Sequence, residues 1–214
     1  MTGTFSSQHT ELSRKLLHGA IDLHIHTAPD IFPRSVDAIE AAQEAKAAGM
    51  SAILVKSHST DTAARAETAT RYAGFPVKGG IALNYSVGGL NPYAVLESAK
   101  QGGRMVWLPT LSARHFLAGA SNVPVLQAES PLQSEGIVVT TEAGELKHEV
   151  EDILQLVKQN DMILSSGHIS PTEAIKVFKR AKEIGFEDLM LQNGISANEA
   201  LERFEFLGRQ NGVG

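Results

Sequence analysis

The sequence predicts an α/β fold in which parallel strands alternate with helices. Short apolar runs recur along the chain and are separated by amphipathic segments of about ten to fifteen residues, a spacing typical of βαβ units. Glycine or proline occurs at many of the boundaries between these segments. With 214 residues, of which 43% are hydrophobic, the chain is long enough for one sizeable core. We therefore expect a single domain over residues 1–214.

Six segments have the composition of buried or half-buried strands. Residues 21–26 alternate apolar and polar side chains, which indicates a strand with one apolar face and one polar face. Residues 51–58 contain an apolar run, which suits a parallel strand buried on both faces. Four further strands are predicted at residues 77–83, 104–109, 162–168 and 187–191.

Capping residues predict the helices between these strands. Ser35 can cap a helix over residues 36–48. Ser170, Pro171 and Glu173 form a strong helix start, with a capping serine, proline at the first position and glutamate at the third. Other helices are predicted at residues 11–17, 60–72, 92–100, 150–159 and 196–207.

An insertion at residues 110–146 interrupts the alternation. Residues 110–135 are predicted to be a loop, and residues 136–146 a hairpin. A loop of this length in a compact domain is usually functional or mobile. His115 in this loop is interpreted as a solvated residue, with a place in a lid over the site as the alternative.

Polar residues stand where the predicted strands end. His24 and His26 share one face of the first strand, because side chains two residues apart on a strand point the same way. Lys56 and His58 share a face at the end of the second strand, Asn84 ends the third, and His168 ends the fifth. Right-handed crossovers bring the carboxyl ends of parallel strands to one edge, so we expect these six side chains to form a site.

The convergence of imidazoles predicts a metal site. Neutral imidazole is the commonest protein ligand for divalent ions, and a half-exposed edge strand that happens to be rich in histidine is the alternative. Zinc, manganese and iron all fit nitrogen and oxygen ligands, and the chain has no cysteine. Lys56 could be a carboxylated bridging ligand, polarise a substrate oxygen or form an ion pair with Asp22 or Asp30, and a site role without metal bridging is favoured. Asp30 itself is a candidate ligand, a proton acceptor or a cap for its own loop.

Composition excludes several classes of function. The net charge of −5 and the pI near 5.9 leave no basic stripe for a nucleic acid. We find no signal peptide and no apolar run long enough to span a membrane, so we expect a cytoplasmic protein with a small-molecule substrate.

The strand-end motifs resemble those of known metal-dependent hydrolases. Residues 22–26 (Asp-Leu-His-Ile-His), followed by residues 29–30 (Pro-Asp), resemble the first-strand signature of the amidohydrolase superfamily. They are also similar to the first motif of the polymerase-and-histidinol-phosphatase (PHP) phosphoesterases. Residues 56–60 and 166–168 resemble later motifs of the same set, and the chain as a whole most resembles an amidohydrolase-like family from about residue 19 to residue 185.

This resemblance implies a TIM-like (βα) barrel that holds one or more divalent metal ions. His24 and His26 would be first-strand ligands, with His58 and His168 as ligands from later strands. The implied activity is hydrolysis of a small molecule by a metal-activated water, with Asp30 as proton acceptor. A PHP-like phosphoesterase and a catalytically inactive, metal-binding pseudo-hydrolase are the alternatives.

The chain departs from the resembled families in two respects. Ala82 and Leu83 stand where a PHP enzyme carries a third-strand glutamate, and no last-strand aspartate of the amidohydrolase type is found. About six βα units are visible, whereas a complete barrel takes about 250 residues. We therefore expect an incomplete or distorted barrel with an open first strand. Either a homo-oligomer or weak hydrolase activity should follow, with the predicted helix at 196–207 as the cover or contact surface.

Overall fold

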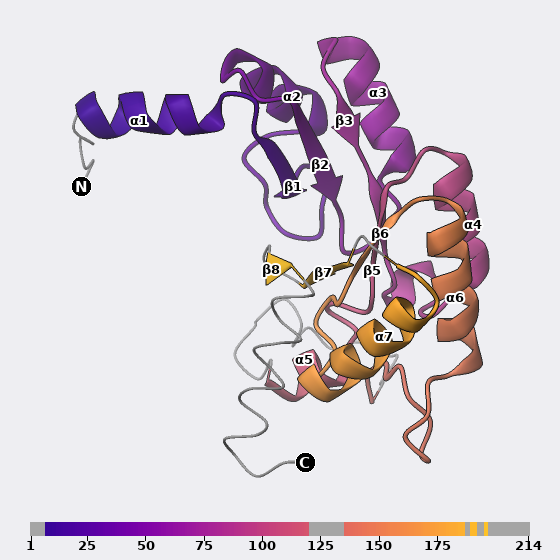
Figure 1. Cartoon of the computed structure of the whole chain (residues 1–214). Coiled ribbons are helices and arrows are strands. Elements are labelled where there is room, and N and C mark those ends of the chain that lie inside the picture. The colour runs from indigo at the N-terminus through magenta and orange to yellow at the C-terminus, as the bar shows by residue number, and fades with distance from the viewer. Residues whose placement is uncertain (1–6, 120–134, 187–188, 192–194, 197–214) are drawn as a thin grey trace.

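The computed structural model describes residues 7–119, 135–186, 189–191 and 195–196 (Figure 1). Strands and helices alternate along these residues, which confirms the α/β prediction. The strands are β1 Ile21–His26, β2 Ala52–Lys56, β3 Val77–Lys78, β4 Gly80–Ala82, β5 Met105–Trp107, β6 Ile163–Ser165, β7 Leu189–Leu191 and β8 Ile195–Ser196. The helices are α1 Ser7–Leu17, α2 Ala38–Ala47, α3 Ala63–Ala73, α4 Pro92–Lys100, α5 Arg114–Gly119, α6 His148–Gln159 and α7 Pro171–Glu183, with a 3₁₀ turn at Tyr85–Val87.

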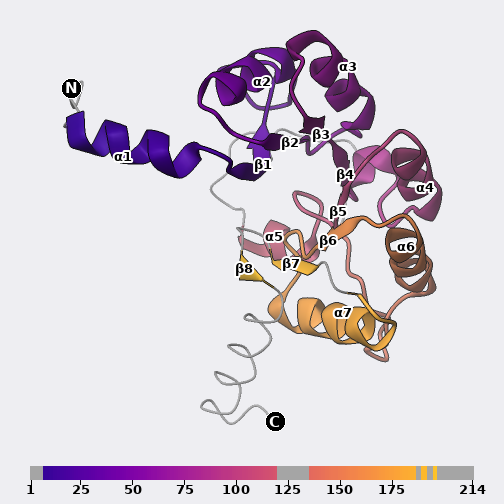
Figure 2. The ribbon, with the colours of Figure 1, turned by 45° about the horizontal axis from the view of Figure 1, so that its top comes forward.

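The strands form two sheets with the orders β1-β2-β3 and β4-β5-β6-β7-β8. Neighbouring strands are parallel except β7 and β8, which are antiparallel. Figure 2 shows α2, α3, α4, α6 and α7 following one another along the outer side of the strands. Among the described strands β1 and β8 do not pair, so the sheets do not close into a barrel.

A pair of glycines separates the two sheets. The predicted strand at 77–83 is divided at Gly79 into β3 and β4. A Cβ on Gly79 would lie 2.4 Å from the Thr62 carbonyl oxygen, and one on Gly80 would lie 2.1 Å from the Met105 carbonyl oxygen. The chain can change neighbours here only because neither residue carries a side chain.

Alternate strand residues divide the core into an outer and an inner layer. On β2, Ile53 and Val55 pack outward against buried alanines of α2 and α3. Leu54 packs inward with Met105 and Trp107 of β5. Lys56 follows the same alternation as Leu54, so it lies on the inner side at the carboxyl end of its strand. The outer layer continues under α4, α6 and α7, where the largest cluster of buried apolar residues lies.

Several predicted boundaries were wrong. Helix α2 begins after Asp37, whose side chain accepts the backbone N–H groups of Ile39 and Glu40, so Ser35 is not its cap. β2 ends at Lys56, which places His58 in the loop beyond the strand. The strand β8 was not predicted. Helix α7 confirms its predicted start, because Ser170 and Glu173 form a capping box around Pro171.

The insertion also differs from its prediction. Residues Arg114–Gly119 form the helix α5, so His115 lies on a helix and not in a loop. The predicted hairpin is reduced to one antiparallel bridge between Thr140 and Leu146. Residues 120–134 of the insertion, and all but the first residue of the helix predicted at 196–207, lie outside the described residues.

The N-terminal edge of the molecule exposes apolar side chains. β1 is the outer strand of its sheet, and its side chains Ile21 and Leu23 are 58% and 38% exposed. Helix α1 precedes this strand and extends away from the body in both views (Figures 1 and 2). On α1, Leu12, Leu16 and Leu17 are exposed as well.

Candidate functional site

The structure brings together the four histidines and Lys56 of the predicted set, and Asn84 lies against His58. His24 and His26 come from β1, Lys56 ends β2, His58 follows β2, and His168 follows β6. The imidazole rings form a contiguous series: the ring centroids are 5.2 Å apart for His24 and His26, 4.6 Å for His26 and His58, and 6.3 Å for His58 and His168. The series lies at the carboxyl ends of the parallel strands, where α/β enzymes carry their sites.

An irregularity in β1 directs the first two imidazoles toward each other. The pairing register with β2 shifts between Asp22 and Ile25, which marks a bulge at this point. Asp22 Oδ1 accepts a hydrogen bond of 2.9 Å from the backbone N–H of His24 inside the bulge. Bulges re-aim side chains, and here the Nε2 atoms of His24 and His26 lie 3.2 Å apart.

Lys56 is buried among aromatic and imidazole rings. Its Nζ lies 3.4 Å from His24 Nε2 and 5.0 Å from the centroid of the Trp107 ring. The side chain is fully buried, and this burial lowers the pKa of Lys56 to about 7. The carboxylates considered as its partners are engaged elsewhere, Asp22 with the backbone of His24 and Asp30 with Arg34.

Asp30 links β1 to the loop that follows it. Its buried carboxylate accepts hydrogen bonds from Arg34 Nε at 2.7 Å and from the Ile31 backbone N–H at 2.7 Å. Asp30 Oδ2 also lies 3.6 Å from His26 Nδ1. The residue therefore caps its own loop, holds a guanidinium and lies behind the ring of His26.

A hydrogen-bond network around Asn84 fixes His58. Asn84 Nδ2 donates to the His58 carbonyl oxygen at 2.8 Å and to Thr110 Oγ1 at 2.7 Å, while Asn84 Oδ1 accepts the backbone N–H groups of Thr110 and Ser112. His58 Nδ1 lies 3.0 Å from Thr110 Oγ1. When Nδ1 donates to this hydroxyl, His58 Nε2 keeps its lone pair for a ligand. Asn84 thus supports the site and is not placed as a substrate contact.

A close approach of the backbone positions His168. Gly167 has φ +56°, and a Cβ there would lie 2.0 Å from the Leu108 carbonyl oxygen. The backbone N–H of His168 donates to the Pro109 carbonyl oxygen at 2.8 Å. The imidazole then packs against Phe116 of α5, with ring centroids 4.9 Å apart.

Burial keeps the four imidazoles neutral. Burial, together with the charge of Lys56, lowers the pKa of His24, His26 and His168 to about 4. The same two causes lower the pKa of His58 to about 2. Neutral imidazole is the form that binds metal ions.

The donor set fits a divalent ion in its chemistry. Two nitrogen ligands on one tetrahedral zinc ion lie about 3.3 Å apart, given bonds of about 2.0–2.1 Å, and the Nε2 atoms of His24 and His26 are separated by 3.2 Å. In the described part of the chain, the buried Nδ1 atoms of His26 and His168 have no hydrogen-bond partner. No three His, Asp or Glu side chains of that part are arranged to hold an ion together. His24 and His26 could therefore begin such a site, and a third ligand would have to move toward them.

Several residues of the site were not singled out by the sequence patterns. Thr110, Arg34, Phe116 and Trp107 each contact a predicted site residue. Arg34 stands four residues after Asp30, a spacing that could have suggested the pair. Thr110 carries no comparable signal, because its role depends on two loops meeting.

Among the described residues, no helix is long and apolar enough to cross a membrane. A search of curated proteins finds no matching relative. Among solved structures, the chain is similar to the tetrameric deoxyribose phosphate aldolase from Aeropyrum pernix, with 16% sequence identity and a TM-score of 0.31 over 91% of this chain and 93% of that one. A family model matches residues 19–204, and the chain therefore belongs to the family of unknown function DUF6282.

Proposed function

We propose that this chain is a metal-dependent hydrolase of the amidohydrolase type, acting on a small molecule within a TIM-like barrel that the described strands complete only in part. The observation that carries the proposal is the contiguous series of four neutral imidazoles at the carboxyl ends of β1, β2 and β6, of which His58 is buried and the other three are partly buried. Burying so many ionisable groups costs free energy, which a bound cation would offset. His24 and His26 would hold the ion together with His58 or His168, and zinc, manganese and iron fit these ligands equally.

The other side chains have distinct roles in this proposal. A bound divalent ion would supply an activated water and polarise a carbonyl or phosphoryl oxygen. Lys56 Nζ donates a hydrogen bond to the substrate oxygen, and the Trp107 ring beside it excludes water from that bond. Asp30 Oδ2 lies 3.6 Å from His26 Nδ1, and a small approach would let the carboxylate orient this ring, as carboxylates behind metal-binding histidines do. Its predicted role as proton acceptor is kept as the alternative, since Arg34 already occupies the carboxylate.

An inactive metal-binding protein is the second candidate. One observation favours it: Asp30, the predicted proton acceptor, is bound to Arg34. A PHP-like phosphoesterase remains the alternative among enzymes. These candidates differ in whether metal-dependent turnover is seen, and in whether amide and ester bonds or phosphomonoesters are cleaved.

Metal analysis of the purified protein is the first test. We expect zinc, manganese or iron to co-purify with the wild type and with His148→Ala, a control at an exposed histidine. His24→Ala combined with His26→Ala should lose the ion, because the double variant removes both Nε2 ligands. Circular dichroism would show that the double variant is folded. Full metal occupancy in a folded double variant would overturn the proposal.

A further inference from the structure

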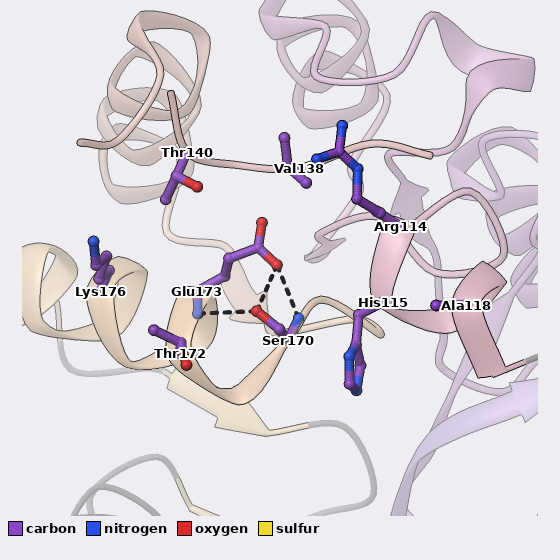
Figure 3. A pocket seen from close by; sticks show the side chains of 9 residues that line it. All are labelled: Arg114, His115, Ala118, Val138, Thr140, Ser170, Thr172, Glu173 and Lys176. Atoms are coloured by element: carbon purple, nitrogen blue, oxygen red, sulfur yellow. Dashed lines mark hydrogen bonds between the residues drawn. The ribbon is translucent and has the colours of Figure 1, made fainter. Parts of the chain in front are cut away.

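A cavity lies where α5 approaches the start of α7. It has a volume of about 380 Å³ and lies between α5, the segment 138–140 and the N-terminal half of α7 (Figure 3). It is lined by Arg114, His115, Ala118, Val138, Thr140, Ser170, Thr172, Glu173 and Lys176.

Two of the lining residues stand close in the sequence to the contact between His168 and Phe116. Ser170 in its floor follows His168 by only two residues. His115 of α5 lines the cavity, and the next residue, Phe116, packs on the His168 ring with centroids 4.9 Å apart. The cavity therefore lies next to the segments that follow β5 and β6, on the side of the site that carries His168.

Basic side chains flank the cavity on two sides. Arg114 on α5 and Lys176 on α7 lie across it from each other in Figure 3, with Glu173 between them. The Glu173 carboxylate is buried and already accepts three hydrogen bonds, from the Val139 N–H at 2.8 Å, the Ser170 N–H at 3.0 Å and Ser170 Oγ at 2.7 Å. These donors disperse its charge into the protein, so the two cations dominate the open part of the cavity.

Within the described part of the chain, neither cation has a firmly held anionic partner. Arg114 pairs with Glu135 at 3.4 Å, but both side chains are exposed, and such pairs contribute only about 0–1 kcal/mol. Lys176 donates to the Gly144 carbonyl oxygen, an uncharged acceptor that leaves its positive charge in place. An anion entering the cavity could therefore recruit both side chains, and guanidinium groups bind carboxylates and phosphates in bidentate fashion. The hydroxyl groups of Thr140 and Thr172 offer further donors.

We infer that this cavity binds the anionic group, a carboxylate or a phosphate, of a small molecule. That this molecule is also the substrate rests on the proposed function, whereas anion binding does not. The cavity would hold the anionic end while the remainder of the molecule reaches toward His168.

Titration with inorganic phosphate and with succinate tests the inference. Both anions are added to chelator-treated protein, so that binding to a metal ion cannot contribute, and the amide resonances of Thr140 and Thr172 are followed by NMR. We expect at least one anion to shift both resonances. Arg114→Ala combined with Lys176→Ala should weaken binding about tenfold or more, equivalent to about 1.4 kcal/mol. Lys179→Ala combined with Lys182→Ala removes the same charge from α7 outside this cavity and should leave the affinity within about twofold.

The outcomes separate the possible ligands. Tighter binding of phosphate indicates a phosphate-bearing molecule, and tighter binding of succinate indicates a carboxylate. No shift at Thr140 and Thr172 with either anion, or equal affinity in the wild type and the Arg114 and Lys176 double variant, would overturn the inference. Because metal content is measured separately, a chain that binds anions here but no metal would overturn the proposed function and leave the anion site standing.

Discussion

Lys56 is an ammonium group that folding removes from water. Its partners are the Trp107 ring and a histidine nitrogen, and neither is a carboxylate. The cost appears as a pKa of about 7, well below the usual value of 10.5. Residues that lower the stability of the folded protein are expected at functional sites. The free-energy cost of burying the Lys56 ammonium group disappears when an apolar side chain replaces it.

Lys56→Met should stabilise the metal-free protein while abolishing hydrolysis. Between pH 7 and 10.5 the unfolded chain binds a proton that the folded chain does not, so wild-type stability rises with pH across this window. The gain from methionine should therefore be greatest at pH 7, more than about 1 kcal/mol, and nearly absent near pH 10. Urea unfolding at both pH values measures it. A methionine variant that is less stable than wild type at pH 7 would contradict this account of Lys56.

The histidines predict a second pH range in which the stability of the fold changes, on the acidic side. The pKa of His24, His26 and His168 falls from 6.5 to about 4 on folding, because burial disfavours the protonated ring. The unfolded chain thus binds more protons between these values, so the stability of the metal-free protein should be complete above about pH 6.5 and should fall toward pH 4. Thermal melts at pH 7 and pH 5 test this, with His24→Ala and His26→Ala combined as the comparison. The double variant should lose less stability between the two pH values than the wild type.

Asp30→Asn separates orientation of His26 from proton transfer. If the carboxylate orients His26, asparagine should lower metal affinity about 10- to 100-fold. It should also destabilise the fold by about 1–3 kcal/mol, because Arg34 loses its charged partner. Metal competition with a chelator and urea unfolding provide the two readouts. An unchanged metal affinity with a large fall in kcat would instead establish Asp30 as the proton acceptor.

At the scale of elements, glycine positions decide where site residues can lie. Gly167 and Gly102 both have positive φ, at +56° and +86°. A Cβ on Gly167 would meet the Leu108 carbonyl oxygen, whereas one on Gly102 would meet no atom within 4 Å. Substitution at Gly102 therefore measures the cost of backbone strain alone, whereas substitution at Gly167 adds the clash with a neighbouring backbone atom.

Gly167→Ala should cost more stability than Gly102→Ala and should displace His168. Strain alone costs about 1–2 kcal/mol at either position. The clash at Gly167 adds to it and moves the chain away from Leu108 and Pro109, so metal retention should also fall. Urea unfolding and metal content of both variants test this. Equal losses of stability and equal metal content in the two variants would show that the close approach of Gly167 to Leu108 is not needed to position His168.

The sequence predicted elements better than it predicted their ends. Strand alternation placed His24, His26 and Lys56 correctly, and the capping box at Ser170 fixed the start of α7. Two short elements were not predicted, because α5 has six residues and β8 has two, which are too few to show a periodic pattern of apolar residues. The bulge in β1 and the meeting of Thr110 with His58 depend on neighbouring segments and therefore left no local pattern.

At the scale of the whole molecule, the sheets remain open on the side that carries β1. An isolated helix of eleven residues is marginal in water, and α1 is such a helix with Leu16 71% exposed. β1 adds an unpaired edge and two exposed apolar side chains. The homo-oligomer predicted from the sequence would cover both.

The absence of cysteine makes this oligomer easy to test. A single Leu16→Cys substitution should give a disulfide-linked dimer under mild oxidation, and Tyr93→Cys should not. Tyr93 is 81% exposed on α4 and serves as a control of similar exposure. Light scattering of the wild type should give the mass of more than one chain. A monomeric mass, with equal cross-linking of the two variants, would contradict the prediction.

Trp107 allows the candidate site to be followed by fluorescence. It is the only tryptophan of the sequence, and its ring is fully buried 6.3 Å from the His24 ring and 5.0 Å from Lys56 Nζ. All tryptophan emission of this protein therefore arises at the candidate centre. Arrival of a paramagnetic ion should quench this emission, and loss of the lysine proton should change its intensity. The chain thus carries a built-in fluorophore that reports metal loading and protonation without any label.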